Sequence, residues 1–235
     1  MLKLIKLEWK KNNIRKYILS ALILAAVLCL FIFSLAFLGI ANDPDTGVPD
    51  TAPGNENISP SIELFTSMSF LVFTSVMLSS FIVSAYKNKT MNLMFSYPIK
   101  RQKILASQML AVWIFNFTAL VFTKLVIYSC ILLGSRTMKS AFPIDYSMAD
   151  SGFYIQLILK SVVIITMSFI ALFVGLAMKS SKAAIISSFL LILLTQANIG
   201  DFTMAGNTVF PIILTIISLI FAFLSVYRAE TADLM

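Results

Sequence analysis

The chain has 235 residues, of which 59% are hydrophobic, only 12% are charged and none is histidine. An average soluble domain carries about twice that charged fraction, so the composition excludes an ordinary soluble globule. Without histidine, the chain alone cannot build a Ser-His-Asp hydrolase or an HExxH metalloprotease. We therefore expect residues 1–235 to form a single membrane-embedded domain.

Long apolar runs define the expected membrane spans, because a helix needs about 20 apolar residues to cross the hydrocarbon core. Residues 1–16 precede them and are expected to form an interfacial helix, with Leu2, Ile5 and Trp9 on one face. The alternative is a plain basic flank of the first span. The predicted fold is an all-α membrane protein with six transmembrane helices, at 17–40, 64–85, 104–133, 153–178, 183–199 and 209–227.

The distribution of lysine and arginine predicts the orientation of the chain. Residues 1–16 carry six of these basic side chains, and the connection at 86–103 carries five more. The opposite connections hold only Arg136 and Lys139, together with most of the acidic residues, Glu63 among them. We therefore expect a multi-pass membrane protein with both termini in the cytoplasm. Positive charge placed at membrane ends also argues against nucleic acid as a partner.

The connection at 86–103 reads YKNKTMNLMFSYPIKRQK and carries an unusual apolar segment outside the membrane. Thr90 can cap a short helix, and Pro98 ends that helix because its ring disfavours α conformation at the residue before it. Exposed methionine and phenylalanine side chains on a cytoplasmic helix favour a protein partner. The alternative is a helix that only lies on lipid headgroups.

The N-terminal LIKLEWKK, the six-helix layout and the stretch at 86–105 together resemble the permease subunit of ABC-2-type transporters. The similarity is to the short bacterial members that export antimicrobial or amphipathic peptides or confer immunity to them. It implies that the cytoplasmic connection is a coupling helix that docks on a separate ATP-binding-cassette ATPase. It also implies two ATPases and a second permease, either another copy of this chain or a sister subunit. The residues that match the coupling pattern are Thr90, Met91, Leu93, Met94, Phe95, Ser96, Tyr97, Pro98 and Arg101.

One position departs from that family pattern. Members often have a glutamate just before the aromatic-basic pair, whereas this sequence has Ala85 there. Any ion pair made by that acid is therefore missing here. The sequence also has no GxxxxGK[ST] loop, so we expect no cofactor in this chain, with ATP and Mg on the partner ATPase. The chain is then a transport subunit and not itself an enzyme.

Other function classes remain as alternatives: a secondary transporter, a non-transporting immunity or anchor protein, and an intramembrane enzyme. A secondary transporter commonly uses an intramembrane carboxylate for ion coupling. Only Lys124 and Lys160 are charged within the predicted spans, which argues against such coupling. An intramembrane enzyme would need a GxSG nucleophile or an acidic pair within the spans, and this sequence has neither.

Two sets of polar residues lie within the predicted spans. Lys124 and Lys160 each lie ten residues from the same external connection, so they are expected at equal depth on adjacent antiparallel helices. They either snorkel to the boundary or make a structural hydrogen bond, or else they line a path for anionic or amphipathic cargo. The second span is rich in hydroxyls, and packing is the simple explanation for them and for Ala171 and Gly175. The family resemblance adds a possible substrate path lined by Ser75, Ser79, Gln196 and Asn198.

Overall fold

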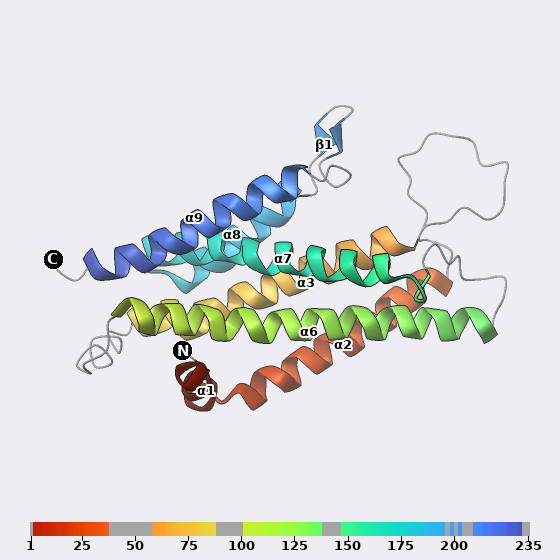
Figure 1. Cartoon of the computed structure of the whole chain (residues 1–235), viewed down its shortest axis with the longest axis horizontal. Helices are drawn as coiled ribbons and strands as arrows, with labels where there is room; N and C mark the ends of the chain where they lie inside the picture. The colour runs from red at the N-terminus through yellow and green to blue at the C-terminus, as the bar shows by residue number, and fades with distance from the viewer. Residues whose placement is uncertain are drawn as a thin grey trace. The chain divides into compact units, whose positions relative to one another are not determined.

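A computed structural model describes residues 2–37, 58–87, 101–137, 147–195, 198–199, 202–203 and 209–231. These residues are helical except for short turns and one small hairpin, in which β1 (Asn198–Ile199) pairs antiparallel with β2 (Phe202–Thr203). The predicted all-α class is therefore confirmed at the level of the described residues (Figure 1).

The helices follow the apolar runs of the sequence closely. The first, α1 (Leu2–Lys11), is separated from α2 by a two-residue turn in which Asn13 has a φ of 49°. The others are α2 (Ile14–Phe37), α3 (Ser59–Leu78), a π-helix η1 (Ser79–Val83), α4 (Ser84–Lys87), α6 (Arg101–Thr137), α7 (Ser151–Ala177), α8 (Ser181–Thr195) and α9 (Val209–Thr231).

Helix α7 ends in a Schellman motif that turns the chain into α8. The backbone N–H of Ser180 donates to the carbonyl of Gly175, and that of Lys179 donates to Leu176. Lys179 has a φ of 47°, at the left-handed position where glycine is the usual residue. The turn is therefore closed by backbone hydrogen bonds although no glycine is present at its left-handed residue.

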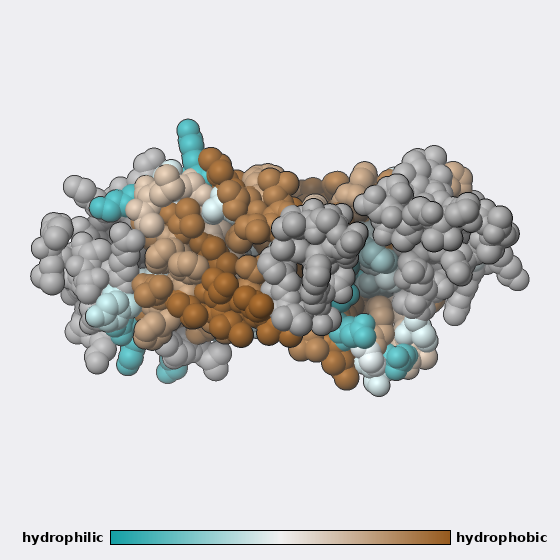
Figure 2. Space-filling model, turned by 90° about the horizontal axis from the view of Figure 1, so that it is seen from above, coloured by the Kyte–Doolittle hydropathy of each residue, from teal (hydrophilic) through white to brown (hydrophobic). Residues whose placement is uncertain are grey.

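Within the described ranges, four helical segments are long and apolar enough to cross a membrane: Ile14–Phe37, Ser59–Val83, Gln102–Ser135 and Ser151–Ala177. Two shorter apolar helices, Ser181–Thr195 and Ile212–Tyr227, follow them. Large aliphatic and aromatic side chains remain exposed on several helices, and hydrophobic residues cover much of the face drawn in Figure 2. Such surfaces belong in lipid or against other membrane helices, so the chain is a helical, membrane-embedded protein.

The fifth predicted span, at 183–199, was wrong at its C-terminal end. Helix α8 stops at Thr195, and residues 198–199 form β1 instead of a further helical turn. The polar run from Thr195 to Asn198 interrupts the apolar pattern at this point. The third predicted span, at 104–133, is longer in the structure, because the helix continues through polar residues on both sides.

The chain divides into two compact units. The first unit contains Met1–Ile14, Met68–Phe117 and Ser161–Met235. Its core brings together side chains from α3, α7, α8 and α9, and the indole of Trp113 on α6 donates to the Thr166 hydroxyl on α7 at 3.3 Å. The buried members of this core are Leu71, Met167, Ala171, Leu191, Ile192 and Leu214.

The second unit contains Arg15–Ser67 and Thr118–Lys160. Aromatic contacts join its helices in pairs. The rings of Phe31 on α2 and Phe65 on α3 meet edge to face with centroids 5.0 Å apart. Tyr128 on α6 and Phe153 on α7 meet in the same way at 4.9 Å. Because α6 and α7 are antiparallel, the second contact fixes which residues of the two helices lie level with one another.

Candidate functional site: buried polar groups among apolar helices

The second unit contains a buried ion pair between α3 and α6. The ammonium Nζ of Lys124 lies 2.6 Å from the carboxylate Oε1 of Glu63. The Lys124 side chain is fully buried, whereas that of Glu63 is 20% exposed. Lys124 is therefore neither a free cation nor a snorkelling one in this arrangement. Its charge is balanced inside the protein, and the carboxylate is the part of the pair that solvent or a ligand can reach.

Glu63 was counted from the sequence among the acids of an external connection, but the structure places it inside α3 and within the membrane-length segment Ser59–Val83. The sequence argument that only lysines are charged within the spans was therefore incomplete. The predicted span began at residue 64, so it excluded the Glu63 carboxylate by a single position.

Lys160 belongs to the same cluster of charges but has a different environment. The Tyr128–Phe153 contact between antiparallel helices puts Leu157 level with Lys124. Lys160 follows Leu157 by three residues, so it lies about 4.5 Å closer to the C-terminal end of α7 than this level. The Lys160 charge acts repulsively on Lys124, which agrees with this placement. Its side chain is exposed and forms no ion pair in the part of the chain that the structure describes. The expected proximity of the two lysines is therefore supported, although their exposures differ.

Of the four polar residues expected to line a path, the structure describes the side chains of Ser75 and Ser79. Ser75 is buried, and its hydroxyl donates to the Leu71 carbonyl of its own helix at 2.9 Å. Ser79 donates across helices, to the Ser181 carbonyl at the start of α8 at 3.3 Å. Gln196 lies outside the described residues, and Asn198 is described only as part of β1.

The predicted coupling residues Thr90, Met91, Leu93, Met94, Phe95, Ser96, Tyr97 and Pro98 lie outside the described residues, and Arg101 is the first residue of α6. What the structure describes are the two helices on either side. On one side, α3 passes through η1, where the N–H of Ser84 donates to the Ser79 carbonyl in the wider π pattern. Single π turns inside α-helices are frequent at functional sites.

The π turn lies at a close approach of three helical elements in the first unit. A Cβ placed on Gly175 of α7 would lie 2.7 Å from the Ala184 Cβ of α8 and 3.2 Å from a methyl of Val83 in η1. Real Cβ atoms essentially never approach to 2.7 Å. Gly175 is therefore required for this packing, which confirms the packing role predicted for the small residues of α7.

We expect Gly175→Ala to lower the free energy of unfolding by about 1–3 kcal/mol, because the added methyl has no room. The sign of this change is informative, because replacing glycine by alanine in a helix interior otherwise raises stability by about 1 kcal/mol. The matched control is Gly152→Ala on the same helix, where the new methyl meets only the flexible Asp150 side chain at 3.1 Å. Detergent-titrated unfolding followed by circular dichroism measures both, and a stabilised Gly175→Ala protein would contradict the packing.

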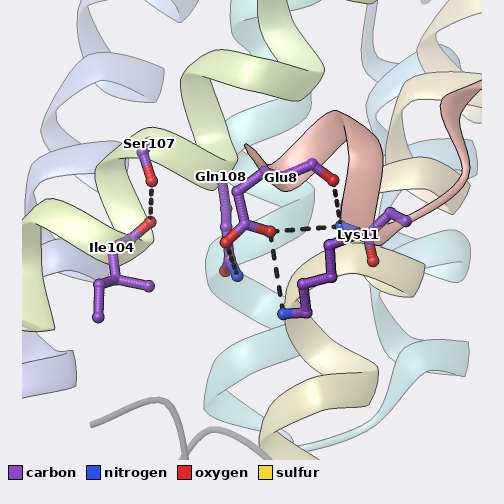
Figure 3. Close-up of polar contacts among 6 residues, drawn as sticks. Glu8, Lys11, Ile104, Ser107 and Gln108 are labelled. Atoms are coloured by element: carbon purple, nitrogen blue, oxygen red, sulfur yellow. Dashed lines mark hydrogen bonds and ion pairs between the residues drawn. The ribbon is translucent and has the colours of Figure 1, made fainter. Parts of the chain in front are cut away.

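On the other side of residues 88–100, α1 is docked against α6. Glu8 is buried, and the Gln108 side-chain amide donates to its carboxylate at 3.3 Å (Figure 3). The Asn12 amide also donates to this carboxylate, and the Trp9 indole N–H donates to the Ala111 carbonyl of α6 at 3.1 Å. Lys11 lies 3.9 Å from Glu8 and is half exposed, so it adds little to this anchor.

This docking changes the interpretation of the N-terminal helix. The sequence placed Ile5 and Trp9 on one face of an interfacial helix, and in the structure Ile5 is buried and Trp9 is hydrogen-bonded to α6. A helix of ten residues is marginal by itself in water, so contacts with a neighbour provide its stability. The exposed side instead carries Lys3, Lys6, Leu7 and Lys10.

We expect Glu8→Ala to release α1 from α6. The Gln108 side chain is fully buried, and the loss of its acceptor costs about 1–3 kcal/mol. Hydrogen exchange of the α1 amides should therefore become at least several-fold faster. Lys6→Ala, on the exposed side of the same helix, is the control and should leave exchange unchanged; equal exchange in both variants would show that Glu8 does not anchor the helix.

Sequence reasoning missed Glu8, Gln108 and the role of Glu63. The available signal was that Glu8 is the one acid in the basic segment at 1–16.

No group of three metal-ligating His, Cys, Asp or Glu side chains occurs in the described ranges. Two buried amide oxygens, Gln108 Oε1 and Asn116 Oδ1, lack a hydrogen-bond partner among the described residues.

The chain resembles a distant relative among known proteins. The chain is 25% identical over 234 residues to "Uncharacterized protein YcbO" of Bacillus subtilis (strain 168), and the match covers 98% of this chain and 99% of that one. No protein-family model matches the sequence. No solved structure matches it either. The likeness extends over the full length, and it carries no activity from the relative to this chain.

Proposed function

We propose that this chain is the transmembrane permease subunit of an ATP-binding-cassette exporter of the ABC-2 type. It moves amphipathic or antimicrobial peptides out of the cytoplasm or the membrane. Six helices, including the shorter α8 and α9, span the bacterial cell membrane with both termini in the cytoplasm. A separate ATPase subunit binds ATP and Mg, and a second permease, identical or related, completes the pathway.

The observation that carries this proposal is the connection between two membrane-length helices. Residues 88–100 join the end of α4 at Lys87 to the start of α6 at Arg101, and they contain the methionine and aromatic residues of the coupling pattern. The basic residues that flank this connection and those of α1 support a cytoplasmic location for both. An apolar segment there is suited to the groove of a soluble partner.

The packing beside the connection supports a mechanical role. The connection is preceded by η1, which is packed against α7 and α8 at Gly175, and it is followed by α6, which holds α1 through Glu8 and Trp9. Closure of the ATPases pushes on the connection, and these tightly packed neighbours move with it as rigid bodies. The helices then alternate the pathway between inward and outward access.

The carboxylate of Glu63 favours one alternative, a secondary transporter. Glu63 provides the acidic group inside a span that ion coupling commonly requires, and it is partly exposed. Its ion pair with Lys124, at 2.6 Å, gives Glu63 a structural role, and ion coupling would be a second role of the same carboxylate. The alternative therefore predicts transport in vesicles that contain this chain and an ion gradient but no ATPase.

Affinity purification of the full-length chain from its native membrane tests the proposal. We expect an ATPase with a Walker A motif to co-purify in stoichiometric amount and to be identified by mass spectrometry. Recovery of the chain with other proteins but without such an ATPase would contradict the proposal and would favour the secondary transporter or a non-transporting immunity or anchor protein.

A further inference from the structure

Helix α1 exposes a basic face on the side that is turned away from α6. With about 3.6 residues per turn, one half of this helix carries five exposed side chains, Lys3, Lys6, Leu7, Lys10 and Lys11. The other half carries the side chains that are buried or hydrogen-bonded to α6, Ile5, Glu8 and Trp9. We call the four lysines and Leu7 the lysine face of α1.

The positive charge of the lysine face exceeds what the acids of its own unit can balance. Glu8 is the only acid in residues 1–37, and its carboxylate is buried and accepts a hydrogen bond from α6. The whole first unit contains twelve lysine and arginine residues: four on α1, five between residues 87 and 103, and three after residue 178. Its acids number four, so eight positive charges remain whichever ion pairs form within the unit. The lysine face is therefore complementary to a negatively charged surface.

The position of α1 along α6 places the lysine face at the membrane boundary. Helix α6 has 37 residues and is about 55 Å long, whereas the hydrocarbon core is about 30 Å thick. If α6 is centred in the membrane, the core begins about 13 Å from the start of the helix. Gln108 and Ala111, which bind α1, lie about 11 and 15 Å from that start. Helix α1 therefore lies level with the lipid headgroups.

We propose that the lysine face of α1 binds the acidic headgroups of phospholipids. The apolar side of α1 packs against α6, so the attraction of this helix to the membrane is mainly electrostatic. The lysine ammonium groups donate to lipid phosphate oxygens, and Leu7, which is 61% exposed, contacts the first carbons of the acyl chains. Zwitterionic lipids have no net charge and are bound more weakly.

The consequence of this binding is that lipid charge holds the N-terminal part of α6. Glu8 and Trp9 join α1 to α6, so a headgroup bound to the lysine face is connected to the helix that follows residues 88–100. The inference goes beyond the proposed function and needs no ATPase. Lipid binding can therefore fail while the ATPase still co-purifies, and the reverse also holds.

The experiment identifies the lipid that lies beside position 7. The full-length chain carries the photo-crosslinking residue p-benzoylphenylalanine in place of Leu7, in nanodiscs of phosphatidylcholine with a minor share of phosphatidylglycerol. Mass spectrometry after illumination measures the ratio of the two lipid adducts. We expect phosphatidylglycerol to exceed its mixing ratio at least about fivefold, the preference that one lysine near an acidic surface provides. The same residue in place of Leu219, which is 57% exposed on α9, is the control and should give the mixing ratio.

The preference should depend on charge. Salt at about 1 M shortens the screening length to about 3 Å and should remove most of the enrichment. Lys3→Gln with Lys10→Gln should lower it at least about fivefold, whereas Lys3→Arg with Lys10→Arg should retain it. Lys179→Gln with Lys182→Gln removes two exposed lysines elsewhere in the same unit and should leave it unchanged.

Two results would overturn the proposal. Adducts at position 7 in the mixing ratio, or an enrichment that survives in the Lys3→Gln, Lys10→Gln protein, would show that the lysine face does not select acidic lipid. An absence of lipid adducts at position 7, with normal adducts at position 219, would show that the lysine face is turned to water or to a protein partner.

Discussion

Glu63→Gln is expected to lower the free energy of unfolding by about 3–5 kcal/mol, because it leaves the buried Lys124 ammonium without a counter-charge. Lys124→Met should cost less, about 1–3 kcal/mol, because the remaining carboxylate of Glu63 is partly exposed and can be reached by water. The asymmetry follows from the exposures alone. Detergent-titrated unfolding of each variant, followed by circular dichroism, measures it.

The double variant Glu63→Leu with Lys124→Met is the decisive member of this set. Replacing both members of a buried pair by apolar side chains of similar size is often neutral, so we expect unfolding close to that of the wild type. Lys103→Met, at an exposed lysine of the same helix α6, is the control for loss of charge and should have little effect. If the double variant lost as much stability as Glu63→Leu alone and Lys124→Met alone added together, Glu63 and Lys124 would not interact.

The helical elements could be predicted from the sequence because their main determinant is local. A long apolar run forces its backbone to satisfy its own hydrogen bonds in lipid, and the run itself can be counted. The first span, expected at 17–40, is α2 at Ile14–Phe37, and the fourth, expected at 153–178, is α7 at Ser151–Ala177. The errors lie at the ends, where polar residues decide whether a helix continues.

The polar contacts of the site could not be predicted in this way, because their determinants are not local. Glu63 and Lys124 are 61 positions apart, and Glu8 and Gln108 are 100 apart. Spacing within one helix gives no information about such partners. The π turn at Ser79–Val83 and the requirement for Gly175 likewise depend on how α3, α7 and α8 pack. Single-sequence reasoning found the lysines and the small residues but not what each one touches.

Met94→Asp combined with Phe95→Asp is expected to abolish co-purification of the ATPase. These residues provide the bulky apolar side chains of the coupling pattern, and truncation of one such anchor commonly costs 2 kcal/mol or more, about thirtyfold in affinity. Two carboxylates in an apolar groove add an unpaired-charge penalty to that loss. Quantitative mass spectrometry of the purified complex should show less than a tenth of the wild-type ATPase, a bound that follows from that loss.

Two further variants separate contact from charge. Met94→Leu with Phe95→Leu keeps the apolar character and should retain most of the ATPase. Ser147→Asp with Ala149→Asp adds the same two charges at exposed positions of another connection, on the opposite side of the membrane in the proposed topology, and should have no effect. Retention of the ATPase by the Met94→Asp, Phe95→Asp protein would remove residues 90–98 from the interface. A loss in all three variants would mean that impaired folding is responsible, because the leucine variant adds no charge and the Ser147→Asp, Ala149→Asp variant places its charges away from the proposed ATPase site.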